Sequence, residues 1–194
     1  MQGVQISPAE LISRQANKIE KAAELFLVTG KRGAGKTTWC LELRRQARAA
    51  GVQPLGLISP AVFEQGMKTG IDLIDLASGE RRRLAVNRHL ALYRLPKQPG
   101  LAKRDWLFDP EALAWGNQIL EGLQHGELLI LDELGPLELL EDEGLTAGMA
   151  LIDEKRFGLT CVVVRPTLVP TALQLWPWGQ VLWTADQPVG RKQQ

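Results

Sequence analysis

The feature that most constrains the fold is the nine-residue stretch GKRGAGKTT, from Gly30 to Thr38. The compact apolar run Glu24–Gly30 precedes it, and the helix-forming stretch Thr37–Gly51 follows it. The order is therefore strand, loop and helix, and the glycines allow left-handed backbone conformations in the loop. Successive N–H groups of such a loop point inward as an anion-binding nest, and the helix N-terminus adds its own unpaired N–H groups. The pattern G-x-x-x-x-G-K-[ST] in this context predicts a phosphate-binding loop.

Lys36, Thr37 and Thr38 stand where a phosphate loop needs a cation and two hydroxyl groups. We expect Lys36 to reach the β- and γ-phosphates, the Thr37 hydroxyl to ligate Mg²⁺, and Thr38 to bond the α-phosphate. Lys31 and Arg32 occupy variable positions, where they either add charge at the γ-phosphate or point into solvent. The nucleotide-binding residues that we predict are Gly30, Lys31, Arg32, Gly33, Ala34, Gly35, Lys36, Thr37 and Thr38.

A second stretch, LLILDELGPLEL (128–139), carries carboxylates where a buried strand is expected to end. Two like charges side by side, Asp132 and Glu133, would each disfavour ionisation of the other. A divalent cation removes much of that penalty for Asp132, which we predict to hold Mg²⁺ together with Thr37. Glu133 is predicted to orient or deprotonate the attacking water. The alternative is that Glu133 faces outward and pairs with a surface arginine.

Two other charged residues have open interpretations. Arg165 follows the apolar run LTCVVV, and it either stabilises charge on the γ-phosphate as an arginine finger or lies on the surface. Glu138 lies just beyond a Gly-Pro turn. It either orients the site from behind or accepts hydrogen bonds from the N–H groups of the turn.

The rest of the chain alternates between strand and helix patterns. Asp109-Pro110 opens a helix that runs to about Leu123, because Asp is a good N-cap and Pro suits the first helical position. The stretch Ile71–Val86 alternates apolar and polar residues around a Ser-Gly pair, which predicts an antiparallel hairpin. We also expect strands at Pro54–Ser59, Leu128–Leu131, Leu159–Arg165 and Gln180–Ala185, a helix near Thr146–Phe157, and a mobile loop at Leu95–Trp106.

These patterns predict an α/β fold: a three-layer sandwich with a mainly parallel sheet, helices on both faces and an antiparallel hairpin insertion. The length of 194 residues suits one domain. We expect that domain to span residues 1–194, with an N-terminal helix in 1–22 and an insertion of about 60–108. Ser7 and Glu10 have the spacing of a capping box at the start of that helix.

Composition argues against several classes of function. The formal net charge is +1, which provides no general attraction to nucleic acid or an anionic membrane. No apolar run approaches the roughly 18 residues of a membrane helix, and no signal peptide is apparent. Cys40 and Cys161 lack metal-ligand spacing and are expected to be reduced, buried thiols. We expect a cytoplasmic protein, a monomer or weak oligomer, with no membrane and no nucleic-acid partner.

Two further stretches have more than one interpretation. The basic run Gly79–His89 suits a lid over phosphates, a contact for an acidic partner or nucleic acid, or the solvated side of a hairpin. The stretch Leu175–Gln180 holds two of the six tryptophans. It either stacks on a base, presents a surface to a partner, or packs in the core as large aromatic residues usually do.

The loop GKRGAGKTT and the stretch LLILDELGPLEL together resemble the small P-loop nucleoside-triphosphatases of thermophiles, a family related to the cancer-related nucleoside-triphosphatase. The family's second motif, Asp-Glu-x-Gly-Pro-x-Glu-Leu, matches residues 132–139, and similarity extends over roughly Phe26–Ala185. The family usually carries an arginine before the hairpin, where this chain has Lys68. It tends to carry Asn-Arg after its last strand, where this chain has TADQPVGRK.

The resemblance implies Mg²⁺-dependent hydrolysis of ATP, GTP and other nucleoside triphosphates to diphosphate and phosphate. We predict this function, with Lys36, Glu133 and Arg165 as catalytic residues and Thr37 and Asp132 at the metal. Two alternatives remain open. One is a kinase for a nucleotide or a small molecule, and the other is a nucleotide switch that an unidentified protein partner activates.

Overall fold

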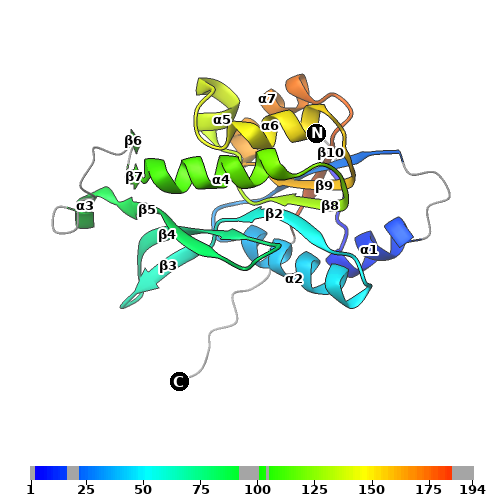
Figure 1. Cartoon of the computed structure of the whole chain (residues 1–194), viewed down its shortest axis with the longest axis horizontal. Helices are drawn as coiled ribbons and strands as arrows, with labels where there is room; N and C mark the ends of the chain where they lie inside the picture. Colours follow the sequence, from blue (N-terminus) through cyan, green and yellow to red (C-terminus); the bar gives the residue numbers. More distant parts are fainter. Residues whose placement is uncertain (1–2, 17–21, 92–100, 104, 185–194) are drawn as a thin grey trace.

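The computed structural model describes residues 3–16, 22–91, 101–103 and 105–184. Within these residues ten strands form one sheet, and helices lie on both of its faces (Figure 1). The predicted α/β sandwich is therefore confirmed. That the whole chain forms a single domain stays a prediction.

One part of the sheet is parallel and contains the strand that precedes the phosphate loop. Its strands lie in the order β10-β1-β9-β8-β2, and each neighbouring pair is parallel. Their bounds are Glu24–Thr29 for β1, Pro54–Ile58 for β2, Gly126–Leu131 for β8, Phe157–Val163 for β9 and Gln180–Trp183 for β10. The carboxyl ends of parallel strands meet at one edge, and ligands of open α/β sheets bind in the crevice outside that edge.

The other part of the sheet is antiparallel and joins the first where β4 pairs with β2. Its strands are β3 (Ala61–Glu64), β4 (Met67–Asp75), β5 (Arg81–Asn87), β6 (Leu101–Lys103) and β7 (Trp106–Phe108). We call residues 61–108 the antiparallel extension. The predicted hairpin is confirmed as β4 and β5, and the Asp75 carboxylate closes its turn by accepting hydrogen bonds from the N–H groups of Ala77 and Ser78.

The longer helices divide between the two faces of the sheet, as Figure 1 shows. One face carries α1 (Pro8–Ala16) and α2 (Lys36–Ala49), and the other carries α4 (Pro110–Gly122), α5 (Pro136–Glu141), α6 (Thr146–Asp153) and α7 (Val169–Leu175). The helix α3 (Arg88–Ala91) and the 3₁₀ turn η1 (Pro166–Leu168) are short. Both predicted helix starts are confirmed, because Ser7 and Glu10 form a capping box and Asp109 caps α4.

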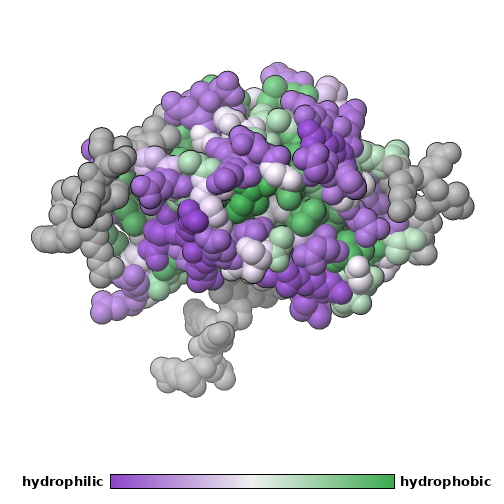
Figure 2. Space-filling model, in the orientation of Figure 1, coloured by the Kyte–Doolittle hydropathy of each residue, from purple (hydrophilic) through white to green (hydrophobic). Residues whose placement is uncertain are grey.

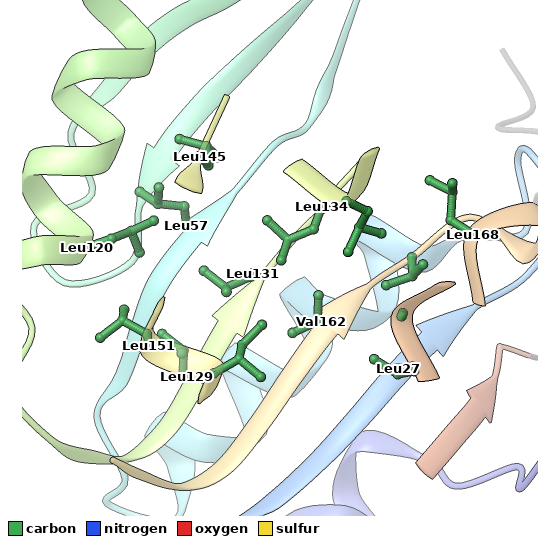
Figure 3. Packing of buried hydrophobic residues seen from close by; sticks show 14 of the residues in the cluster. Leu27, Leu57, Leu120, Leu129, Leu131, Leu134, Leu145, Leu151, Val162 and Leu168 are labelled. Carbon is green, nitrogen blue, oxygen red and sulfur yellow. The ribbon is translucent and has the colours of Figure 1, made fainter. Parts of the chain in front are cut away.

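The core consists of two hydrophobic layers, one on each face of the parallel strands. Leu25 and Leu27 face the layer under α4, α6 and α7, whereas Phe26 and Val28 face the layer under α1 and α2. Side chains alternate in this way because successive residues of a strand point to opposite faces. Figure 3 shows the first layer, where Leu27, Leu129 and Val162 of the strands gather with Leu120 and Leu151 of the helices. Strands that are buried on both faces explain the continuous apolar runs of the sequence.

The structure also tests the predictions for the cysteines, for the end of one helix and for the tryptophans. Cys40 and Cys161 are buried and form no disulfide, as predicted. The helix expected to reach about Phe157 ends at Asp153, because Lys155 has a left-handed backbone (φ 52°) and Phe157 already begins β9. The tryptophans of the described residues all pack against the two core layers.

The N-terminal and loop expectations are only partly covered by the described residues. The helix expected in 1–22 is α1, which starts at Pro8 and ends at Ala16, and residues 1–2 and 17–21 lie outside the described part of the chain. Of the loop expected at 95–106, residues 95–100 and 104 lie outside it, and Leu101–Lys103 form β6.

Polar residues cover most of the face shown in Figure 2, with smaller areas of hydrophobic residues between them. In the described part of the chain, no helix has the length and apolar character needed to cross a membrane.

Candidate active site

The phosphate loop connects β1 to α2 and has the backbone that its glycines permit. Gly33 (φ 83°) and Gly35 (φ 77°) both lie in the left-handed region, and α2 begins directly after Gly35 at Lys36. Gly30 is needed for a different reason, because a Cβ atom there would stand 2.5 Å from the Thr184 hydroxyl oxygen. The expectation that Gly30 also supplies a left-handed backbone is therefore wrong, since its requirement is close packing against the end of β10.

Lys36 lies across the mouth of this loop. Its Nζ atom donates hydrogen bonds to the carbonyl oxygens of Gly30, at 2.9 Å, and Lys31, at 3.0 Å. Partial burial lowers the pKa of Lys36, while the carboxylates of Glu133 and Asp132 oppose that shift. The ammonium group is thus held between the loop and the two acids, where it can exchange its carbonyl partners for phosphate oxygens.

Asp132 follows β8 and is almost fully buried, with 4% of its surface exposed. Its carboxylate accepts a hydrogen bond from the Ser59 N–H, at 3.2 Å, and another from the Thr37 hydroxyl. Burial raises the pKa of Asp132 to about 7, although these two hydrogen bonds act in the opposite direction. The two predicted metal residues, Thr37 and Asp132, are therefore in direct contact.

This pair fits a magnesium ion in its donor chemistry. Mg²⁺ takes oxygen ligands and is usually held by one or two protein groups, with water and phosphate oxygens completing its coordination. Among the described residues, no cluster of three or more His, Cys, Asp or Glu side chains is arranged to hold a metal. Thr37 and Asp132 would accordingly supply the protein's share of the ligands, and a cation would offset the buried charge of Asp132.

Glu133 has an unusual backbone and a specific partner. Its φ angle is 81°, which is costly for a residue with a side chain, and strain of this kind concentrates at functional sites. The next residue, Leu134, is buried and donates its N–H to the Val163 carbonyl, which holds the turn in place. Arg165 donates two hydrogen bonds to Glu133 Oε1, from Nε at 2.8 Å and from a terminal nitrogen. The structure thus joins Glu133 and the exposed Arg165 in one ion pair, which is the pairing with a surface arginine that the alternative interpretation of Glu133 predicted.

Lys68 comes from the antiparallel extension and lies close to the same acids. Its Nζ atom stands 4.7 Å from the ring centre of Trp106. Burial lowers the pKa of Lys68, Glu133 acts most strongly in the opposite direction, and Arg32 reinforces the lowering. The residue at the family's arginine position therefore faces the phosphate loop, and within the described chain no carboxylate forms an ion pair with it.

Glu138 has a structural partner for each of its oxygens. Oε2 accepts from the Gly135 N–H at 2.7 Å, and Oε1 accepts from the Leu145 N–H at 2.9 Å. The side chain is 8% exposed, and burial raises its pKa. Of the two interpretations of Glu138, bonding to turn N–H groups is the one that the structure supports, and the carboxylate ties the start of α5 to the start of α6.

The first three arginines of the basic run Gly79–His89 have partners in the extension and in α4. Arg83 lies 2.6 Å and Arg81 3.5 Å from carboxylate oxygens of Asp72, a buried residue that the sequence did not single out. Arg82 lies over the ring of Trp115, 4.6 Å from its centre. These contacts favour the solvated side of a hairpin over a lid or a nucleic-acid contact.

The remaining predicted nucleotide-binding residues form the rim of the loop. Lys31, Arg32 and Thr38 are exposed, and Ala34 is buried. The Ala34 N–H donates to the Lys31 carbonyl at 3.1 Å, which closes a turn inside the loop. The side chains of Lys31 and Arg32 therefore have the solvent exposure of the second interpretation.

The fold and the site together define a protein of the P-loop α/β class. The glycine-rich loop follows β1, the acid pair follows β8, and β9 lies between those two strands. The model of the NTPase family matches residues 25–166, and the chain belongs to that family.

Individual relatives agree with this assignment. The chain is 28% identical to nucleoside-triphosphatase THEP1 of Caldivirga maquilingensis over 148 residues, which are 76% of this chain and 80% of that protein. It is 30% identical to nucleoside-triphosphatase THEP1 of Thermofilum pendens over 135 residues, which are 70% of this chain and 71% of the relative.

Solved structures support the fold. A human cancer-related nucleoside triphosphatase superposes with a TM-score of 0.60 and 20% identity, covering 83% of this chain and 88% of that one. THEP1 of Aquifex aeolicus superposes with a TM-score of 0.57 and 14% identity, covering 87% and 92%.

Proposed function

We propose that the chain hydrolyses nucleoside triphosphates, among them ATP and GTP, to diphosphate and phosphate in a Mg²⁺-dependent reaction. The observation that carries the proposal is the contact of Thr37 with Asp132, directly beside Lys36 and Glu133 at the carboxyl edge of the parallel strands. The relatives named nucleoside-triphosphatase support the same reaction.

The loop and Lys36 have the task of binding the triphosphate. The N–H groups at the start of α2 offer hydrogen-bond donors, and Lys36 adds a full positive charge. Mg²⁺, when bound, would be held by Thr37 and Asp132 and would neutralise charge on the phosphate oxygens.

Glu133 has the task of orienting the attacking water. Both hydrogen bonds from Arg165 end on Oε1, so Oε2 can accept a hydrogen bond from water while the ion pair stays intact. Glu133 is partly exposed, which allows water to reach it. Arg165 then serves first as a positioning residue that fixes the Glu133 carboxylate.

A steady-state assay of phosphate release from ATP, GTP, CTP and UTP, with and without Mg²⁺, tests this proposal. Wild-type protein is expected to release phosphate only with Mg²⁺, and Lys36→Ala should lower kcat/KM by about 100-fold or more, since it removes a charge on the transferred group. Phosphate found on an acceptor other than water would indicate the kinase. Tight binding with negligible release until a protein partner is added would indicate the switch. The cytoplasmic location and the weak or absent oligomerisation stay predictions.

A further inference from the structure

A cavity of about 230 Å³ lies beside the first residues of the phosphate loop, outside the group of acids described above. It is lined by Gln5, Gly30, Lys31, Trp183 and Thr184. Among the described residues, the lining offers an indole ring, a side-chain amide, a hydroxyl group and one cation, and no carboxylate. Gly30 and Lys31 belong to both the loop and the cavity, so the cavity adjoins the phosphate loop.

The N-terminal segment 3–6 forms one wall of this cavity because it pairs with β10. The Val4 N–H donates to the Val181 carbonyl, and the Trp183 N–H donates to the Val4 carbonyl, each at 2.9 Å. The bridge between Val4 and Leu182 is parallel. Gln5 therefore leaves the sheet at the same carboxyl edge as the phosphate loop.

The segment is also held on both sides of Gln5. The Trp39 indole N–H donates to the Ile6 carbonyl at 3.3 Å, which ties the segment to α2. Gly3 lies against the Trp183 ring so closely that a Cβ atom there would stand 2.6 Å from Nε1. Trp183 is thus supported on one side by the segment and contributes to the cavity wall as well.

We propose that this cavity takes the base and ribose of the nucleoside triphosphate whose phosphates bind the loop. Trp183 provides the stacking surface, and the Gln5 amide, with both a donor and an acceptor, distinguishes one base from another. The inference rests on the proposed function only in taking the ligand to be a nucleoside triphosphate.

Size and position agree with a subsite for part of a nucleotide. Cavities that enclose a whole drug-sized ligand have roughly 300–1,000 Å³, so the smaller volume suits a base whose phosphates lie elsewhere. Stacking on an aromatic ring tolerates every base, because each base has a π-face. Gln5, Trp183 and Thr184 lie outside residues 25–166, so the family match does not include these walls.

The test compares nucleotides with a ligand that has phosphates and no base. Affinities of the full chain for ATP, GTP, CTP, UTP and inorganic tripolyphosphate are measured by calorimetry with Mg²⁺. Trp183→Ala should weaken every nucleoside triphosphate about 5- to 150-fold, the range for loss of one base–aromatic stack, and leave tripolyphosphate affinity unchanged. Trp183→Phe, which keeps an aromatic ring, should retain most of the nucleotide affinity.

Two further variants control for folding and test base selection. Trp178→Ala removes another half-buried tryptophan, one that lies under Lys155 rather than beside the loop, and should change neither affinity. Gln5→Ala, at an exposed position, should shift the relative affinities for the four nucleotides by about 2- to 10-fold and leave tripolyphosphate unchanged.

The outcomes separate this inference from the proposed function. Equal losses of nucleotide and tripolyphosphate affinity in Trp183→Ala, or no loss of either, would overturn the base subsite. A wild-type protein that binds nucleotides without releasing phosphate would overturn hydrolysis, while the selective loss in Trp183→Ala would still support the subsite.

Discussion

The parallel strands and the antiparallel extension each contain a buried aspartate, Asp132 and Asp72, whose charges have different surroundings. Asp72 of the extension is 5% exposed and lies against two guanidinium groups, those of Arg83 and Arg81. Asp132 of the parallel part is 4% exposed, has two hydrogen bonds and, among the described residues, has no guanidinium partner.

The difference teaches how a buried charge can indicate function. A buried carboxylate that is paired within the fold completes a local structure, as Asp72 does. A buried carboxylate whose charge is left largely uncompensated, as at Asp132, favours a neutral form or a cation from outside, which is what a metal site requires. Two cations of the extension show the same contrast. Arg82 lies over Trp115 and pairs with Glu80, whereas Lys68 lies over Trp106 beside the acids of the site, Asp132 and Glu133.

The largest expected effect is on Glu133, at the edge of the parallel strands. Glu133→Gln keeps the shape of the side chain but cannot accept a proton, so kcat should fall about 100- to 10,000-fold while nucleotide affinity is retained. Single-turnover phosphate release and a binding titration measure the two quantities separately. Glu80→Gln, on an extension glutamate that pairs with Arg82, is the matched control and should leave kcat unchanged. Robust turnover by Glu133→Gln would remove Glu133 from the proposed role.

The next prediction compares how Asp72 and Asp132 affect the free energy of unfolding. Asp72→Asn leaves Arg83 and Arg81 without their carboxylate, and we expect it to lower the free energy of unfolding by about 2 kcal/mol, discounted because both arginines are partly exposed. Urea denaturation measures this change, and kcat should be little affected. An unchanged unfolding midpoint would show that the pairing contributes nothing to stability.

Asp132→Asn, in contrast to Asp72→Asn, should raise the free energy of unfolding. The folded-state pKa of Asp132 is about 7, above the ordinary 3.8, so its protonation stabilises the fold at low pH and that contribution is lost as the pH rises through about 7. Asparagine carries no charge to bury, so without Mg²⁺ the variant should gain on the order of 1–2 kcal/mol over wild type near pH 8.

The pH dependence of that gain is the sharper measurement. Thermal unfolding of both proteins in a metal chelator should give melting temperatures that converge toward about pH 4 and separate progressively up to about pH 7, above which the difference stays constant. A constant difference between about pH 4 and about pH 7 would contradict an Asp132 that titrates near neutral pH. Hydrolysis by the variant should be lost at every pH.

The smallest effect compares two cations of the extension, Lys68 and Arg82, each of which lies over a tryptophan ring. Lys68→Met removes a charge that faces the acids and the loop, and should lower kcat/KM about 10-fold, whereas Lys68→Arg should restore most of it. Arg82→Met is the matched control, since Arg82 lies over Trp115, and it should leave kcat/KM unchanged. Equal effects of Lys68→Met and Arg82→Met would mean that the extension acts on the site only through its stability.

The phosphate loop was the most predictable part of the molecule. Gly33 and Gly35 have the left-handed backbone expected of them, and α2 starts at Lys36, because these features depend on residues that are neighbours in the chain. The contact of Thr37 with Asp132 was predictable as well, since the ends of parallel strands meet at one edge. The sequence analysis predicted the end of α6 too far along the chain, because the residue pattern does not indicate the left-handed backbone of Lys155.

Other contacts could not be predicted, because they join distant parts of the chain. Arg165 binds Glu133 across 32 positions, so the sequence offered a surface arginine as a partner for Glu133 without identifying Arg165. Asp72 is ordinary in the sequence, and its importance appears only once β4 and β5 pair. Gly30 was expected to serve the loop backbone, and its actual constraint is the Thr184 side chain.

The sequence by itself determined the conformation of the loop, the chemistry available at the two strand ends and the family, since backbone sterics and residue types act over a few neighbouring positions. Only the tertiary structure decided which charged side chains form ion pairs and which do not, because those pairings depend on strand order and register. It also decided that the N-terminal segment stands beside the phosphate loop, since its pairing with β10 joins the two ends of the described chain.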